Sequence, residues 1–380
     1  MTAKLSLLDA AWEIGPAVAA DRRYLHQHPE LAFQERNTAR FVAERLRALG
    51  IETRTGIAKT GVLGLLRGGR EGKTVLLRAD MDALPMDELN DVPYRSRNPG
   101  VMHACGHDAH TAMLLGVARI LAERRGEIRG NVKFAFQPAE EAEGGAKPMI
   151  DEGALEDPRV DAAFGVHIGQ DLPVGTIGVT TGPMNAASDG FVATIRGKGG
   201  HAARPHGCVD PVVIAAQSIV AMQTLVSREV NPLRQAVITV GALHAGTVAN
   251  IIPEMAVMKA TVRTFDEEVR QQLAERIPAL IGGLAAAMRG EAEVAYKFGY
   301  PPLINDAAMT DLVREVARGL VGPERLIERE PGMGGEDMAY FLQRAPGSFF
   351  RIGSRNPAKG LVYGHHHPRF DIDEEALPVG

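Results

Sequence analysis

The first half of the chain alternates between helical and strand-like apolar patterns. Helical spacing covers three segments: Ser6–His26, Asn37–Leu49 and His110–Arg125. Short continuous apolar runs, typical of strands buried on both faces, cover three others: Lys73–Arg78, Asn131–Gln137 and Ala162–His167. Because strand alternates with helix, the pattern predicts an α/β domain with a mostly parallel sheet.

The segment from Asn185 to Tyr300 has a different order. It predicts strand, helix, strand, strand, helix and strand: Gly190–Arg196, Asp210–Glu229, Gln235–Gly241, Glu254–Thr264, Asp266–Arg289 and Glu291–Phe298. The order β-α-β-β-α-β is typical of a ferredoxin-like fold. We therefore predict an inserted domain over 185–300. Residues 1–184 and 301–380 would then form one discontinuous domain.

Composition and charge exclude several classes of protein. The chain is 45% hydrophobic and 23% charged, as globular proteins are, and its net charge of −5 gives no basic footprint for nucleic acid. Two cysteines cannot form a disulfide framework, which favours a reducing compartment, and we expect the cytoplasm. The start lacks the continuous apolar region of a secretory signal. The longest apolar-looking stretch, Val212–Val226, contains polar residues, so no membrane span is expected.

The segment Met102–His110, MHACGHDAH, carries the strongest chemical signal. Cys105 and His107 flank Gly106 just before a predicted helix, so both side chains can point to one place. Thiolate, imidazole and carboxylate groups are the ligands of divalent transition metals. The segment therefore indicates a metal site.

Further candidate ligands follow the other predicted strands. They are Asp80 and Asp82, then Glu140 and Glu141, then His167. In open α/β sheets, ligands bind beyond the carboxyl ends of the strands, where these residues fall. More histidines stand in a later turn at positions 365–367. Together these residues favour a metallohydrolase.

The chain resembles the hippurate hydrolase and indole-acetyl-amino-acid hydrolase group of amidohydrolases, relatives of the aminoacylases and two-metal carboxypeptidases. Eight blocks in order carry the resemblance: RRYLHQHPELAFQE at Arg22–Glu35, LLRADMDALPMDE at Leu76–Glu88, MHACGHDAH, FAFQPAEEAEGGA at Phe134–Ala146, GKGGHAARPH at Gly197–His206, GTVANIIPE at Gly246–Glu254, GGEDMAYF at Gly334–Phe341 and HHPRFDIDEEALPVG at His366–Gly380. They span nearly the whole chain, so the match is highly specific.

The resemblance implies two divalent metal ions held by five protein ligands. The matching residues are Cys105, His107, Glu141, His167 and His366. Because histidines also stand at 365 and 367, the last ligand stays open among the three. The ions could be zinc, manganese, cobalt or nickel, since ligand type alone does not decide occupancy.

The resemblance also implies catalytic and substrate-binding residues. Glu140 would be the general base, because neighbouring side chains on an extended segment point in different directions and Glu141 would face a metal. The alternative is a solvated acidic loop. His201 would polarise the scissile carbonyl, from the partner subunit in dimeric relatives. Asn250, Arg263 and Gly335 would contact the substrate, although a lone arginine is as often a solvated surface charge.

Asp80 and Asp82 share one face of an extended segment at i and i+2. In related two-metal carboxypeptidases the first of these positions is a histidine ligand, and here Cys105 and His107 take its place. We therefore expect both aspartates to fix the tautomers of the metal-binding histidines. The alternative is a pair of turn-forming aspartates. His26 and His28 are expected to cap and pack a helix end.

We expect hydrolysis of an N-acyl-L-amino acid, such as a hippurate-, acetyl- or indole-acetyl-amino acid, to a carboxylate and a free amino acid. The inserted domain would act as a lid and dimerisation contact, giving a homodimer or higher homo-oligomer. One alternative is a dipeptidase or carboxypeptidase of the same fold. Another is a binding protein that keeps the fold without activity, against which the complete ligand set argues.

Overall fold

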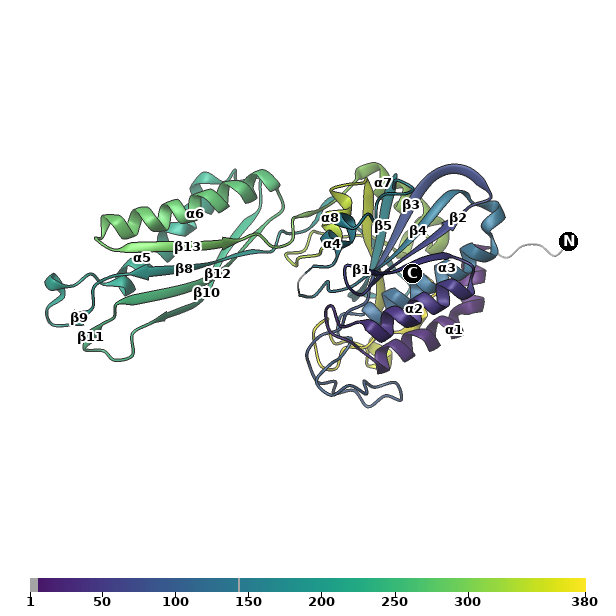
Figure 1. The fold of residues 1–380 in the computed structure, drawn as a ribbon, viewed down its shortest axis with the longest axis horizontal. Helices are drawn as coiled ribbons and strands as arrows, with labels where there is room; N and C mark the ends of the chain where they lie inside the picture. The colour runs from purple at the N-terminus through teal and green to yellow at the C-terminus, as the bar shows by residue number, and fades with distance from the viewer. Residues whose placement is uncertain (1–5, 143) are drawn as a thin grey trace. The chain divides into compact units, whose positions relative to one another are not determined.

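The computed structural model describes residues 6–142 and 144–380, which divide into two compact units (Figure 1). The first unit contains the described residues up to Gly182, together with Ile304–Glu330 and Tyr340–Gly380. The second contains Pro183–Leu303 and Pro331–Ala339. Each unit has a hydrophobic core of its own.

The first unit is built on a mixed eight-stranded sheet in the order β1-β2-β4-β3-β5-β16-β6-β15. Its strands are β1 (Glu52–Ile57), β2 (Gly61–Arg67), β3 (Arg70–Asp80), β4 (Arg129–Gln137), β5 (Ala162–Pro173), β6 (Ile177–Val179), β15 (Leu326–Glu328) and β16 (Gly347–Arg355). The central strands β4, β3, β5 and β16 are parallel, as are β6 and β15. The β1–β2, β2–β4 and β6–β16 pairs are antiparallel. The parallel centre brings the ends of β3, β4 and β5 to one edge.

Helices of the first unit pack against this sheet or against one another. They are α1 (Leu7–Gln27), α2 (Arg36–Ala48), α3 (His107–Glu123), α4 (Ala146–Asp151) and α7 (Ala307–Val321), with α8 (Met338–Leu342) at the boundary. Helices α1, α2 and α3 lie together (Figure 1), and α3 packs on β3. Helix α3 is buried along most of its length, which explains its apolar sequence on more than one side. The short strands β7 (Gly182–Asn185) and β14 (Leu303–Asn305) form a separate pair.

The second unit has the order β8-α5-β10-β12-α6-β13, the order that its apolar pattern predicts. These elements are β8 (Asp189–Arg196), α5 (Pro211–Thr224), β10 (Ala236–Ala245), β12 (Met255–Thr264), α6 (Glu267–Ala287) and β13 (Glu291–Lys297). The sheet order is β10-β12-β8-β13, with every pair antiparallel. Asp210 and Asp266 begin the two helices by accepting backbone N–H bonds. A small ribbon pairs β9 (Gly200–His201) with β11 (Ile251–Ile252).

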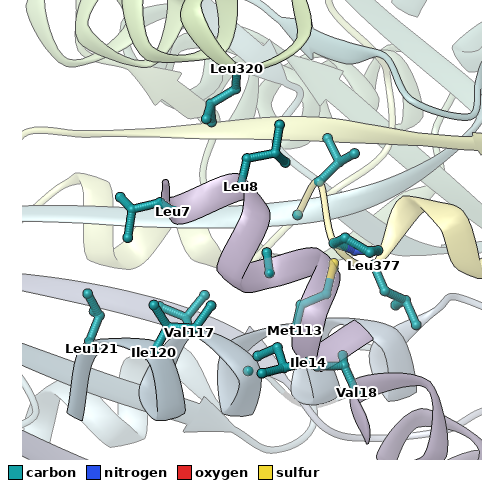
Figure 2. A pocket seen from close by; sticks show the side chains of 15 residues that line it. Leu7, Leu8, Ile14, Val18, Met113, Val117, Ile120, Leu121, Leu320 and Leu377 are labelled. Atoms are coloured by element: carbon teal, nitrogen blue, oxygen red, sulfur yellow. The ribbon is translucent and has the colours of Figure 1, made fainter. Parts of the chain in front are cut away.

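An apolar pocket lies between α1, α3 and the last residues of the chain (Figure 2). Its labelled lining residues are Leu7, Leu8, Ile14, Val18, Met113, Val117, Ile120, Leu121, Leu320 and Leu377. Of the described residues that line it, none has a carboxylate, imidazole or thiol side chain. The side chains that line the pocket therefore offer no group for acid–base chemistry. In the described part of the chain, no helix is both long and apolar enough to cross a membrane.

Candidate metal centre

Helix α3 begins inside the MHACGHDAH segment and positions its thiol and imidazole. Gly106 precedes the helix with φ +91°, a left-handed conformation that glycine adopts without strain. A Cβ on Gly106 would also come within 3.3 Å of the Ile168 side chain. Cys105 and His107 are both buried on either side of this turn. The glycine therefore allows the left-handed turn between two candidate ligands.

Candidate ligand atoms from four segments of the first unit come together. Three overlapping groups each have their ligand atoms within 4.8 Å of one another: Cys105 with His107 and His167, Cys105 with Glu141 and His366, and His107 with Glu140 and Glu141. Cys105 Sγ lies 3.4 Å from His167 Nε2, and His366 Nε2 lies 3.0 Å from Glu141 Oε1. Cys105, His107 and Glu141 each belong to two of these groups, so the groups form one continuous cluster of candidate ligands.

The donor atoms fit divalent cations. His107 is buried, and its Nε2 has no hydrogen-bond partner among the described residues. His167 Nδ1 lies 2.7 Å from the Ile168 carbonyl, which accepts its proton and leaves Nε2 free to coordinate. Burial and the neighbouring Glu141 raise the pKa of the Cys105 thiol, with His107 opposing them. A bound cation would reverse that effect, because it favours the thiolate.

Asp82 connects two segments of the centre. Its backbone carbonyl and Oδ1 lie 2.9 and 3.2 Å from His107 Nδ1, so this nitrogen carries the proton and Nε2 faces the cluster. Its two carboxylate oxygens accept the backbone N–H groups of Glu140 and Glu141 at 3.0 and 2.9 Å. Asp82 thus fixes the tautomer of His107 and also holds the backbone of Glu140 and Glu141 in place.

Asp80 contacts a different histidine more closely. Its Oδ1 accepts from His110 Nδ1 at 2.6 Å, and its Oδ2 accepts from Arg78 at 2.7 Å. The distance from Asp80 Oδ2 to His107 Nε2 is 3.7 Å. His110 Nε2 accepts the backbone N–H of Ile168 at 2.8 Å, so both of its nitrogens are engaged. Asp80 and His110 therefore support the strand that carries His167.

Two residues at the centre have a backbone conformation that is rare outside glycine. Ala139, just before Glu140, has φ +56°, and His366 has φ +61°. Such conformations cost about 1–3 kcal/mol each and occur often at functional sites. Of the three consecutive histidines, His366 is the one within contact of Glu141, while the ring centroid of His365 lies 5.1 Å from that of His167.

A buried ion network lies beside the cluster and joins four segments. Arg22 on α1 is fully buried and contacts Asp108 at 2.7 Å and Asp371 at 2.8 Å. His26, also fully buried, lies 2.8 Å from Asp108 and 3.2 Å from Glu88. Asp108 directly follows a candidate ligand on α3, and Asp371 lies in the loop that carries another. The network therefore fixes two ligand-bearing segments to one helix.

We expect the stability of the fold to fall above neutral pH because His26 loses its proton. Burial and the Arg22 cation lower the pKa of His26, but Asp108 and Glu88 outweigh them and raise it to about 9. The folded pKa exceeds the unfolded value of about 6.5, so the stabilisation is complete below pH 6.5 and lost as the pH rises through about 9. The loss amounts to about 3 kcal/mol.

Urea unfolding between pH 6 and 10 measures this loss. His26→Gln should remove this part of the pH dependence, whereas His28→Gln, two residues away at the helix end, should keep it. Equal pH profiles for wild type and His26→Gln would show that His26 is not charged in the folded protein.

The second unit holds the other predicted site residues at two separate ends of its sheet. His201 is exposed in β9, opposite Ile251 and next to Asn250, whose carbonyl accepts the N–H of Ala202 at 3.1 Å. Arg263 lies at the other end of β12, eight residues from Met255 and therefore about 26 Å along the strand.

Arg263 Nη1 donates to the Asp189 carbonyl at 3.3 Å. A Cβ on Gly335 would come within 2.8 Å of Ser188 Oγ, which places this glycine at the same end. The four residues therefore form two pairs, His201 with Asn250 and Arg263 with Gly335.

Sequence reasoning missed the ion network. Arg22 and Asp108 were not singled out, and His26 was expected only to cap and pack a helix end, although it is part of a buried charge cluster. The sequence contains no spacing signal for it, because its members come from positions up to 352 residues apart. Arg329 and Arg351, which line a pocket with Ile168, were missed for the same reason.

Comparison with known proteins identifies the family. The model of peptidase family M20/M25/M40 matches residues 76–380. An N-acetyl-L-cysteine deacetylase of Bacillus subtilis is 46% identical over 356 residues, 94% of this chain and 83% of the relative. A putative amidohydrolase of the same organism is 45% identical over 357 residues, 94% of this chain and 90% of the relative.

A solved structure shows the same fold. A dinuclear metal binding peptidase of the M20 family from Bacillus subtilis has a TM-score of 0.84 at 38% identity, over 97% of this chain and 95% of the other. That peptidase binds two metals, and the described residues of this chain include a cluster of candidate ligand atoms. The chain belongs to peptidase family M20/M25/M40, as a metal-dependent hydrolase of its amidohydrolase group.

Proposed function

We propose that the protein hydrolyses N-acyl-L-amino acids to a carboxylate and a free amino acid. The observation that carries the proposal is the cluster of thiol, imidazole and carboxylate groups, in which Cys105 belongs to two groups of three. A deacetylase of N-acetyl-L-cysteine among the relatives supports an acyl-amino-acid substrate. The free, buried thiol at the centre suits the reducing cytoplasm, where we propose the enzyme works.

Two divalent cations would be held by residues of the first unit. Cys105, His107 and His167 would hold one, and Cys105, Glu141 and His366 the other. When bound, such a pair polarises the amide carbonyl and lowers the pKa of a water towards about 7. Zinc, manganese, cobalt and nickel all suit these donors.

Glu140 is the proposed general base. Its side chain lies in one group with His107 and Glu141, and its backbone N–H is held by Asp82. Because Glu140 and Glu141 are neighbours on an extended segment, one carboxylate can bind metal while the other faces the attacking water. Glu140 would take the proton of this water and give it to the departing amine.

Residues 185–300 are the proposed lid and dimerisation domain, inserted into a catalytic domain of residues 1–184 and 301–380. We assign His201 to the oxyanion, Asn250 to a second polar contact with substrate, Arg263 to the substrate carboxylate and Gly335 to backbone contact. The two pairs lie at opposite ends of one sheet, so a single small substrate cannot contact both pairs of the same chain. By resemblance to dimeric relatives, in which the matching histidine acts in the partner's site, we propose that His201 and Asn250 serve the partner. Arg263 and Gly335 would then serve their own subunit.

His201→Ala should lower turnover by about 10²–10³-fold without loss of metal, because it removes one group that stabilises the oxyanion. Mixing His201→Ala with Glu140→Gln chains tests where His201 acts. Equal amounts of the two chains give dimers of which half are mixed. If His201 acts in the partner's site, each mixed dimer has one intact site out of two, so about a quarter of wild-type turnover returns. No recovery after verified exchange would place His201 in the site of its own chain.

A substrate panel tests the reaction. Acetyl-, benzoyl- and indole-acetyl-amino acids are compared with Gly-X dipeptides, on protein loaded with each metal. Faster release of amino acid from the acyl-amino acids supports the proposal. Faster cleavage of the dipeptides would make the protein a dipeptidase. No turnover of any of them by the metal-loaded protein would favour a binding protein instead.

A further inference from the structure

A basic pocket lies beside the metal centre in the first unit. Its volume is about 270 Å³, and it is lined by Ile168, Gly169, Gln170, Asp171, Arg329, Arg351, Gly364 and His365. Since one water occupies about 30 Å³ of the liquid, the space can take a group of several heavy atoms. Two arginine side chains, one carboxylate and one imidazole line it.

The sheet register places Arg351 next to a candidate metal ligand. Arg351 on β16 pairs with His167 on β5 in a parallel register, so both side chains leave the same face of the sheet. The His365 ring packs edge-on against the His167 ring at a centroid distance of 5.1 Å. The pocket is therefore adjacent to the metal-ligand cluster, because its lining residue His365 contacts His167. Another lining residue, Ile168, directly follows His167 in the chain.

The second arginine is held in place by its neighbours. The Arg329 side chain crosses Gly178, where a Cβ would come within 2.6 Å of Arg329 Cδ. Its guanidinium is paired with Asp171. His365 Nδ1 is buried and has no hydrogen-bond partner among the described residues. A polar atom without a partner in a basic pocket favours a ligand that forms hydrogen bonds.

We propose that this pocket binds a carboxylate of the substrate, with Arg351 as the group that contacts it. The planar fork of an arginine matches the two oxygens of a carboxylate and can form paired hydrogen bonds with them. The inference rests on the proposed function, because it concerns the substrate of the same metal centre. The carboxylate comes from one of two sources: a second carboxylate on a dicarboxylic acyl group such as succinyl, which leaves the α-carboxylate to Arg263, or the α-carboxylate itself, which Arg263 would then not hold.

Two ratios of kcat/KM distinguish these sources on the metal-loaded enzyme. One compares N-succinyl- with N-butyryl-L-phenylalanine, and the other compares N-acetyl-L-phenylalanine with its amide. In Arg351→Met, the first ratio falls about 10–100-fold if the pocket takes the acyl carboxylate, and the second falls by this factor if it takes the α-carboxylate. The matched control is Arg355→Met, an exposed arginine on the same strand outside the pocket. If neither ratio changes in Arg351→Met, the proposal is wrong.

Calorimetric titration with succinate tests the pocket without relying on turnover. Succinate should bind about 10–100-fold more weakly to Arg351→Met and to Arg329→Met than to wild type or Arg355→Met. Equal affinity in all four proteins would overturn the proposal even if the enzyme hydrolyses acyl-amino acids. Weaker binding in the two pocket variants would support the pocket even if no acyl-amino acid is turned over. Circular dichroism of each variant verifies its fold.

Discussion

Glu140→Gln should retain its metal ions and lose turnover by about 10²–10⁴-fold, the range in which general acid–base catalysis contributes. The amide keeps the size and the backbone contact with Asp82, but it cannot accept a proton from water. Metal content by mass spectrometry and kcat on N-acetyl-amino acids measure the two effects together. The expected result is full metal content with a large loss of kcat.

The neighbouring glutamate is the matched control. Glu141→Gln removes a proposed ligand that lies 3.0 Å from His366 Nε2, so it should lose metal content as well as turnover. If Glu140→Gln also loses metal, Glu140 is itself a metal ligand, instead of Glu141 or together with it. If Glu140→Gln keeps near-normal turnover, another group is the base.

Arg22→Met should destabilise the fold by about 3–5 kcal/mol, because it leaves buried carboxylates without their cation. Arg22 is fully buried and contacts Asp108, Asp371 and Glu374. Burial raises the pKa of Asp108, but the charges of Arg22 and His26 outweigh it and hold this pKa well below its usual range. Urea unfolding at pH 7 measures the loss.

Arg23 provides the control for this substitution. It is the next residue on α1, its side chain is 52% exposed, and it contacts Glu374 at 2.5 Å. Exposed pairs contribute about 0–1 kcal/mol, so Arg23→Met should have little effect. Similar losses for Arg22→Met and Arg23→Met would mean that the buried network does not support the fold.

The elements with strong apolar patterns could be predicted from the sequence. Strand β3 and helix α3 are found within a few residues of their predicted positions, because burial on both faces demands continuous apolar runs. The sheet is mixed, with antiparallel pairs on both sides of a parallel centre, where a mostly parallel sheet was expected. The antiparallel pairs involve short or glycine-containing strands such as β2 and β6, which give weak signals.

The site shows the same division between local and distant signals. Cys105 and His107 are set close by their spacing around Gly106, so a local motif is enough to predict that they meet. Glu141 and His366 are 225 residues apart, and only the fold brings them within 3.0 Å. The Arg22 network and the Arg351 pocket depend on sheet and helix packing alone. No spacing in the sequence could have predicted them.

The most direct test of the account is the metal content of the purified protein, measured with its metal-dependent release of amino acid from N-acetyl- and benzoyl-amino acids. The account predicts close to two divalent ions per chain, turnover that chelation abolishes and metal restores, and loss of both in Cys105→Ala. A protein that binds no metal and releases no amino acid from either substrate would contradict the site built on Cys105 and His107.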